Sequence, residues 1–217
     1  MKLDNFIVFE GIDGAGTSTQ IEILKKNPAC SSFLFTAEPS ACPTGKYLRQ
    51  MLKGDFSITN ETAAYLFAAD RNEHVNGKLS IQKNELVSGI KEACSTGNIV
   101  VSDRYLFSSL AYQSISCPPE IPRLLNSLFP LPSLLFYFDI TPDVSLKRIS
   151  SRSTREIYEK ESFLNQVVIE YKKIISEYSD PKKSSEMKIV IIDAQKSPEE
   201  VSEVIRNEIN STLGLEI

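Results

Sequence analysis

Three glycines follow the first apolar run of this 217-residue chain and form a loop suited to phosphate. Gly11, Gly14 and Gly16 stand within the segment E-G-I-D-G-A-G-T-S-T-Q, residues 10–20. Glycine lets successive backbone N–H groups turn toward one anion, and the helix expected from Thr17 adds the dipole of its N-terminus. The residues expected to bind phosphate are Gly11, Gly14, Ala15, Gly16, Thr17, Ser18 and Thr19.

The same loop lacks one basic residue. It fits the pattern G-x-x-x-x-G-K-[ST] except that Thr17 stands where the lysine is expected. Ser18 offers the hydroxyl that such a loop uses for Mg²⁺, and Asp103, at the end of a later apolar run, offers a carboxylate directly or through water. We therefore predict a phosphate site with Mg²⁺. A glycine-rich turn that binds no phosphate is the alternative.

Two further clusters combine aromatic, hydroxyl and guanidinium groups. Phe67 and Arg71 are four residues apart on an expected helix, so a ring and a hydrogen-bond donor share one face and could take a planar base. Arg104, Ser108 and Tyr112 recur every four residues after the third apolar run. The alternatives are a core phenylalanine beside a solvated arginine, and a solvated helix face.

Five short apolar runs would position these groups, and they are separated by segments with helical spacing. The runs are Phe6–Phe9, Phe33–Phe35, Ile99–Val101, Leu134–Phe138 and Ile189–Ile192. None alternates with polar residues, so we expect strands buried on both faces. Helix starts are expected at Thr59 or Asn60, at Thr141-Pro142 and at Ser197-Pro198, and residues 114–122 are expected to be a loop. The pattern predicts an α/β fold: a five-stranded parallel sheet flanked by helices on both faces.

Composition excludes several classes of protein. A net charge of −4 and one histidine give no basis for a nucleic-acid partner or a histidine-rich metal site. The four cysteines show no C-x-x-C pair, which favours free thiols in a reducing compartment. No apolar run approaches a membrane span or a signal peptide. We expect a single domain over 1–217, cytoplasmic, with no membrane partner.

The motifs F-E-G-I-D-G-A-G, L-F-A-A-D-R and D-R-Y-L-F-S-S-L-A-Y-Q resemble, in this order, the signatures of the thymidylate kinase family. The resemblance implies the P-loop nucleoside monophosphate kinase fold, transfer of the ATP γ-phosphoryl group to dTMP, Mg²⁺, and a homodimer. It also implies a dTMP site. That site would consist of Glu38, Arg49, Phe67, Arg71, Arg104, Ser108, Ser109, Tyr112 and Gln113.

In this resemblance Tyr112 would lie under the deoxyribose, and Asp13 would face the sugar hydroxyl and the acceptor phosphate. Residues 150–158 resemble the family's short lid over ATP, which implies Asp13, Arg104, Arg152 and Arg155 as catalytic residues. Many members have D-R-x-E in the lid, whereas this chain has I-Y-E at 157–159 with Arg155 earlier. Two alternatives stay open: a nucleotide-binding protein impaired in catalysis by the loss of the lysine, and a kinase of another deoxynucleotide such as dUMP.

Overall fold

The computed structural model describes residues 1–81, 85–150, 160–184 and 187–217, with no account of the side chains of 78–81, 85–88 and 184. Its centre is the expected five-stranded parallel sheet, in the order β2-β5-β1-β6-β7. The strands are β1 (Lys2–Gly11), β2 (Leu34–Ala37), β5 (Val100–Asp103), β6 (Leu131–Asp139) and β7 (Lys188–Asp193). All five apolar runs therefore lie on strands, except that Phe33 and Ile99 directly precede β2 and β5.

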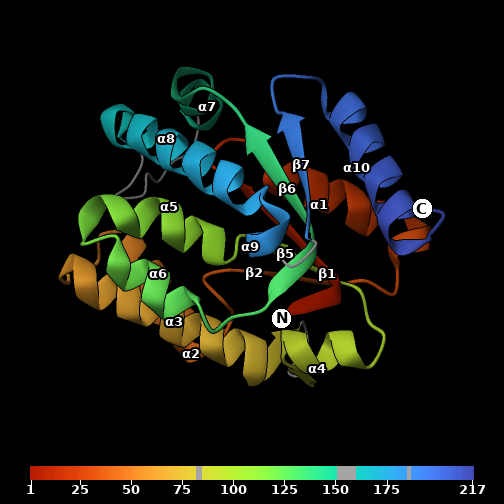
Figure 1. Cartoon of the computed structure of the whole chain (residues 1–217), viewed down its shortest axis with the longest axis horizontal. Helices are drawn as coiled ribbons and strands as arrows, with labels where there is room; N and C mark the ends of the chain where they lie inside the picture. The colour runs from red at the N-terminus through yellow and green to blue at the C-terminus, as the bar shows by residue number, and fades with distance from the viewer. Residues whose placement is uncertain (82–84, 151–159, 185–186) are drawn as a thin grey trace.

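Helices cover both faces of this sheet, as expected (Figure 1). One face carries α1 (Thr17–Lys26) and α10 (Pro198–Leu213), and the other carries α4 (Ile90–Ser95), α5 (Leu106–Ser116) and α8 (Glu161–Tyr178). An outer layer beside α5 consists of α2 (Pro43–Leu52), α3 (Asn60–Asn76) and α6 (Glu120–Asn126). The remaining elements are a 3-10 turn (Pro28–Cys30), β3 (Lys78–Ile81), β4 (Glu85–Ser88), α7 (Pro142–Ile149) and α9 (Pro181–Ser184).

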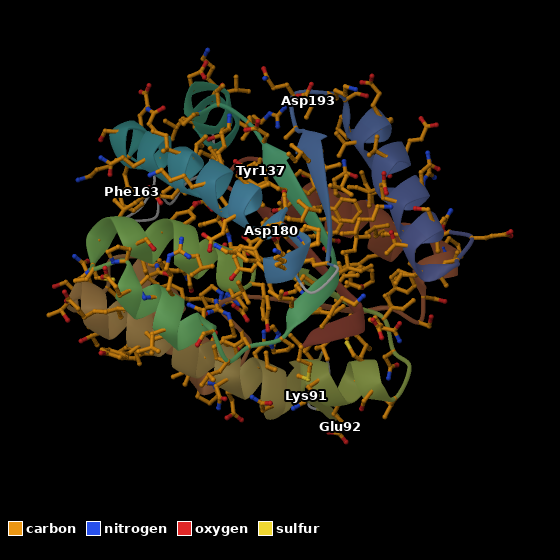
Figure 2. The ribbon with its side chains drawn as sticks, in the orientation of Figure 1. Lys91, Glu92, Tyr137, Phe163, Asp180 and Asp193 are labelled. Atoms are coloured by element: carbon orange, nitrogen blue, oxygen red, sulfur yellow. The ribbon has the colours of Figure 1, made fainter. Side chains whose placement is uncertain are left out.

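The central strands hold the core. Phe6, Ile7, Val8 and Phe9 of β1 have no exposed surface, and β6 is buried along almost its whole length. Tyr137 of β6 packs on Tyr171 of α8 with ring centroids 5.2 Å apart. Figure 2 shows Tyr137 in the middle of the molecule and Lys91 and Glu92 at its margin. Strands buried on both faces explain why their sequences do not alternate.

The prediction that every strand is buried on both faces is wrong for the two edge strands. Each residue of β2 is only partly buried, and Ile191 of β7 is 61% exposed. Both strands end the sheet and have a neighbour on one side only. Their sequences look like central strands because apolar content does not encode the order of strands.

The three helices begin where predicted, but the Thr141 side chain at the start of α7 makes no cap hydrogen bond. Thr59 caps α3 by accepting from the backbone N–H of Thr62, and Ser197 forms a capping box with Glu200 at α10. The predicted loop over 114–122 is too long, because α5 continues to Ser116 and α6 begins at Glu120. Pro122 lies in the first turn of α6, where its missing N–H has no helical partner to lose. The β3–β4 hairpin was not predicted.

Candidate active site

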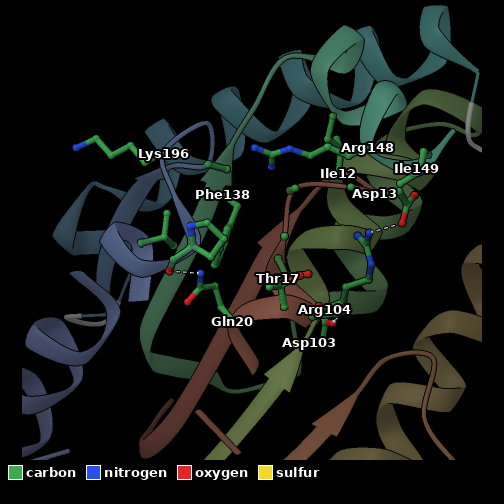
Figure 3. Close-up of a pocket in the computed structure, with 18 residues that line it drawn as sticks. Ile12, Asp13, Thr17, Gln20, Asp103, Arg104, Phe138, Arg148, Ile149 and Lys196 are labelled. Atoms are coloured by element: carbon green, nitrogen blue, oxygen red, sulfur yellow. Dashed lines mark hydrogen bonds and ion pairs between the residues drawn. The ribbon is translucent and has the colours of Figure 1, made fainter. Parts of the chain in front are cut away.

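The glycine-rich loop connects β1 to α1 and has the backbone that its glycines predict. Gly14 and Gly16 have φ angles of 82° and 99°, in the left-handed region, and Gly16 is the N-cap of α1. A Cβ on Gly14 would lie 2.6 Å from the carbonyl oxygen of Ser145 on α7. The loop lines a pocket at the N-terminus of α1, shown in Figure 3, which we call the donor pocket.

Ser18 and Asp103, the two predicted metal ligands, touch each other. The Ser18 hydroxyl donates to Oδ2 of Asp103 over 2.7 Å, and both residues line the donor pocket. Oδ1 of Asp103 is buried and has no hydrogen-bond partner among the described residues. Mg²⁺ binds few protein groups beside water and phosphate oxygens. It is suited by this site, which offers the Ser18 hydroxyl, the unpartnered carboxylate oxygen of Asp103 and a phosphate-binding loop. The residues present fit the ion.

Arg104 stands between the donor pocket and a second pocket. Its φ of 71° is the only positive value at a non-glycine residue among the described residues. The guanidinium donates to Asp13 Oδ1 (2.8 Å), to the carbonyl of Gly11 (2.9 Å) and to the hydroxyl of Ser108 (3.1 Å). Burial lowers the pKa of Arg104, but the Asp13 carboxylate and other groups raise it well above its usual range overall. The cation is therefore permanent.

The second pocket, which we call the acceptor pocket, contains the predicted dTMP residues. Arg104 and Asp13 belong to both pockets. The acceptor pocket is lined by all nine residues that the resemblance implied: Glu38, Arg49, Phe67, Arg71, Arg104, Ser108, Ser109, Tyr112 and Gln113. They come from the loop after β2, from α2 and α3, and from the end of β5 with α5. Long-range packing thus brings three separate motifs to one cavity.

Arg71 is buried, so the alternative of a solvated arginine is wrong. It is 1% exposed and donates to Glu38 Oε2 over 2.6 Å and to Ser109 Oγ over 3.1 Å, with a further bond to Asn126. Its Nε is buried without a hydrogen-bond partner in the described part of the chain. The stripe of Arg104, Ser108 and Tyr112 likewise faces the acceptor pocket and not solvent.

Sequence reasoning missed His74, the one histidine of the chain. It is fully buried, and its ring nitrogens lie 3.1 Å from Glu38 Oε1 and 2.7 Å from Thr36 Oγ1. Both carboxylate oxygens of Glu38 are thus engaged inside the protein, one by His74 and one by Arg71. His74 lies three residues after Arg71, one helical turn along α3, so the two side chains share a face of the helix. That spacing could have indicated that His74 and Arg71 reach the same carboxylate.

A model of the thymidylate kinase family matches residues 9–205 of this chain. A protein of Treponema pallidum is 38% identical over 205 residues, covering 94% of this chain and 93% of its own length. A thymidylate kinase of Leptospira borgpetersenii is 33% identical over 210 residues, covering 93% and 92%. One of Leptospira interrogans is 36% identical over 177 residues, covering 78% and 81%.

The chain belongs to the thymidylate kinase family. It is therefore a phosphotransferase of the nucleoside monophosphate kinase type, with ATP as the family's co-substrate. The sheet order β2-β5-β1-β6-β7 with helices on both faces agrees with the P-loop kinase fold. Within the described ranges, no helix is long and apolar enough to cross a membrane.

Thr17 begins α1 in this thymidylate kinase fold, so no ammonium group lies at that position of the loop. The described cationic residues that line the donor pocket are Arg104, Arg148 and Lys196, and Figure 3 shows the last two on its upper side. Arg152 and Arg155, which the resemblance placed in the lid, lie outside the described residues. All four cysteines are buried, and none forms a disulfide with another described residue.

Proposed function

We propose that the donor pocket holds the phosphates of ATP, that the acceptor pocket holds dTMP, and that the γ-phosphoryl group passes between them beside Arg104. The observation that carries the proposal is that Asp13 and Arg104 line both pockets. A phosphoryl transfer needs its two nucleotides to meet at one point and needs the charge there to be neutralised. The Asp13–Arg104 pair marks that point.

On the donor side, most of the proposed contacts to ATP come from backbone N–H groups. The N–H groups of Gly14, Gly16, Thr17, Ser18 and Thr19, at the N-terminus of α1, would bind the phosphate oxygens, whereas the Ala15 N–H already donates to the carbonyl of Ile12 and Gly11 does not line the pocket. Ser18 and Asp103 would hold Mg²⁺, directly or through water. When bound, the ion neutralises charge on the phosphates.

On the acceptor side Arg49 and Arg104 would hold the phosphate of dTMP, Phe67 would stack on thymine, and Arg71 would contact the carbonyl edge of the base. Arg104 is well suited to its role, because Asp13, Gly11 and Ser108 hold its guanidinium from three sides. The Arg104 guanidinium lies 5.6 Å from the ring centroid of Tyr112, which supports Tyr112 beside the sugar. A nucleotide phosphate with a second pKa of about 6 is already mostly a dianion at neutral pH, so no strong base is required.

Arg152 or Arg155 would compensate in part for the absence of a lysine at position 17, a proposal that rests on the resemblance of residues 150–158 to the family's lid. An arginine that reaches the transferring group can be worth ~10³–10⁵ in rate. If either residue acts so, Arg152→Ala or Arg155→Ala should lower kcat strongly, and less so in the presence of Thr17→Lys. Unchanged kcat in both single variants would refute the proposal that a lid arginine compensates for the absent lysine.

A homodimer through α2, α3 and α6 is the proposed assembly. Large apolar side chains are exposed on these neighbouring helices or just after them: Tyr47 (43%), Tyr65 (55%), Leu124 (74%) and Leu128 (87%). Apolar surface gathered on adjacent elements is typical of an interface. Sedimentation velocity of the purified protein would distinguish the dimer from a monomer.

A coupled ADP-release assay tests the proposed function directly. With Mg-ATP we expect turnover with dTMP well above that with dUMP, dCMP or UMP. Binding of nucleotide without turnover of any acceptor would favour a protein that has lost catalysis with the lysine. Preference for dUMP or dCMP would instead reassign the acceptor.

A further inference from the structure

Glu10 is a buried carboxylate that the mechanism above does not use. It stands one residue before Gly11 at the end of β1, has no exposed surface, and lines neither the donor nor the acceptor pocket. A charged side chain is rarely buried completely unless its hydrogen bonds are satisfied. The question is what those bonds hold in place.

Four donors converge on this one carboxylate. Oε1 accepts from the backbone N–H groups of Tyr105 (2.8 Å) and Ser108 (3.1 Å). Oε2 accepts from the hydroxyls of Ser108 (2.6 Å) and Tyr171 (2.8 Å). Tyr105 precedes α5, Ser108 lies in its first turn, and Tyr171 is on α8. The side chain therefore fixes the start of α5 against β1 and α8.

The start of α5 is also where Arg104 is held. Arg104 directly precedes Tyr105, and its guanidinium donates to the hydroxyl of Ser108 while that hydroxyl donates to Glu10. The chain of hydrogen bonds thus runs from Arg104 through Ser108 to Glu10. The backbone of Arg104 is in the left-handed region, a conformation that persists only where the surroundings hold it.

We propose that Glu10 is a positioning residue for the acceptor phosphate. Its carboxylate orders Arg104 through Ser108 and the first turn of α5, so that the guanidinium presents its remaining donors to the nucleotide. The role rests on the proposed function, because it presumes that Arg104 binds the phosphate of dTMP. It is distinct from the roles of the pocket-lining residues, since Glu10 would touch neither substrate.

Glu10→Gln is the variant of choice because it keeps the volume of the side chain. Its amide has only one acceptor oxygen, so its NH₂ would face either the two hydroxyls or the two backbone N–H groups that now donate to the carboxylate, and the present four hydrogen bonds could not all persist. We expect the dissociation constant of dTMP, measured by calorimetry, to rise about tenfold, as expected for loss of a charge-assisted hydrogen bond. Glu203→Gln, on the exposed side of α10, makes the same side-chain replacement as a control and should leave binding unaltered.

A double-mutant cycle separates positioning from a general structural effect. If Glu10 acts through Arg104, Glu10→Gln should change the dTMP dissociation constant less than about twofold in an Arg104→Met background. An equal loss in both backgrounds, or no loss in the wild-type background, would overturn the inference. If the wild-type protein itself binds no dTMP, the proposed function fails and the inference fails with it.

Tyr171→Phe provides a second route should Glu10→Gln not fold. It removes one of the four donors and leaves the carboxylate in place. We expect a smaller rise in the dTMP dissociation constant, about threefold. Unaltered binding in this folded variant would contradict the proposed chain of contacts.

Discussion

Replacing Glu10 by Gln should remove a pH dependence from the stability of this protein. Burial raises the pKa of Glu10 from 4.5 to about 7, against the lowering effects of the Ser108 hydrogen bond, the Arg104 charge and the Tyr171 hydrogen bond. The folded state therefore binds this proton more tightly than the unfolded chain does. The corresponding stability is fully present below pH 4.5 and is lost as the pH rises through about 7.

The size of the effect follows from the two pKa values. Each tenfold difference in proton affinity is worth about 1.4 kcal/mol, so the rise from 4.5 to about 7 corresponds to about 3 kcal/mol. Glutamine does not titrate, so the wild-type protein should lose about 3 kcal/mol relative to Glu10→Gln between pH 4.5 and 8. The other groups facing Glu10 hold their protonation across this range, because the pKa values of Arg104, Tyr112 and Tyr171 are all raised.

Urea unfolding of both proteins at pH 5, 6, 7 and 8 measures this difference, and groups common to both proteins cancel. Glu203→Gln should run parallel to the wild type. If the free energies of unfolding of wild type and Glu10→Gln differ by a constant amount across the series, the carboxyl is not desolvated as the structure indicates, and the reasoning fails.

Three further outcomes are expected. Asp103→Asn should raise the Mg²⁺ concentration needed for half-maximal turnover at least about tenfold, since it weakens one of the two proposed ligands; an unaltered Mg²⁺ titration would exclude Asp103 from the metal site. Gly14→Ala should lower the free energy of unfolding by about 1–3 kcal/mol more than Gly97→Ala, because both positions have positive φ but only the Gly14 Cβ meets an atom, Ser145 O at 2.6 Å. Glu38→Gln should cost about 3–5 kcal/mol by leaving the buried Arg71 cation uncompensated, and equal stability in chemical denaturation would show that the pair is not essential.

Much of the fold is predictable because its signals are local. A short continuous apolar run is typical of a strand in a parallel sheet, and each of the five runs overlaps a strand. Helix caps depend on neighbouring residues, as Thr59 and Ser197 illustrate. The phosphate loop is the clearest example, since Gly14 and Gly16 adopt the positive φ angles that their residue type permits. The acceptor residues were identified by family resemblance. The spacing of residues alone did not exclude that Arg71 is exposed to solvent.

By itself, then, the sequence determined the strands, the helix starts, the phosphate loop and the absence of a lysine at position 17. The tertiary structure decided which strands lie at the edges, that Glu38 contacts both the buried Arg71 and His74, and that Glu10 accepts from Ser108, 98 positions further along the chain. The physical reason is the distance along the chain over which each effect acts. Backbone preference and burial pattern act over a few residues, whereas the partner of a buried charge is chosen only when distant segments pack against each other.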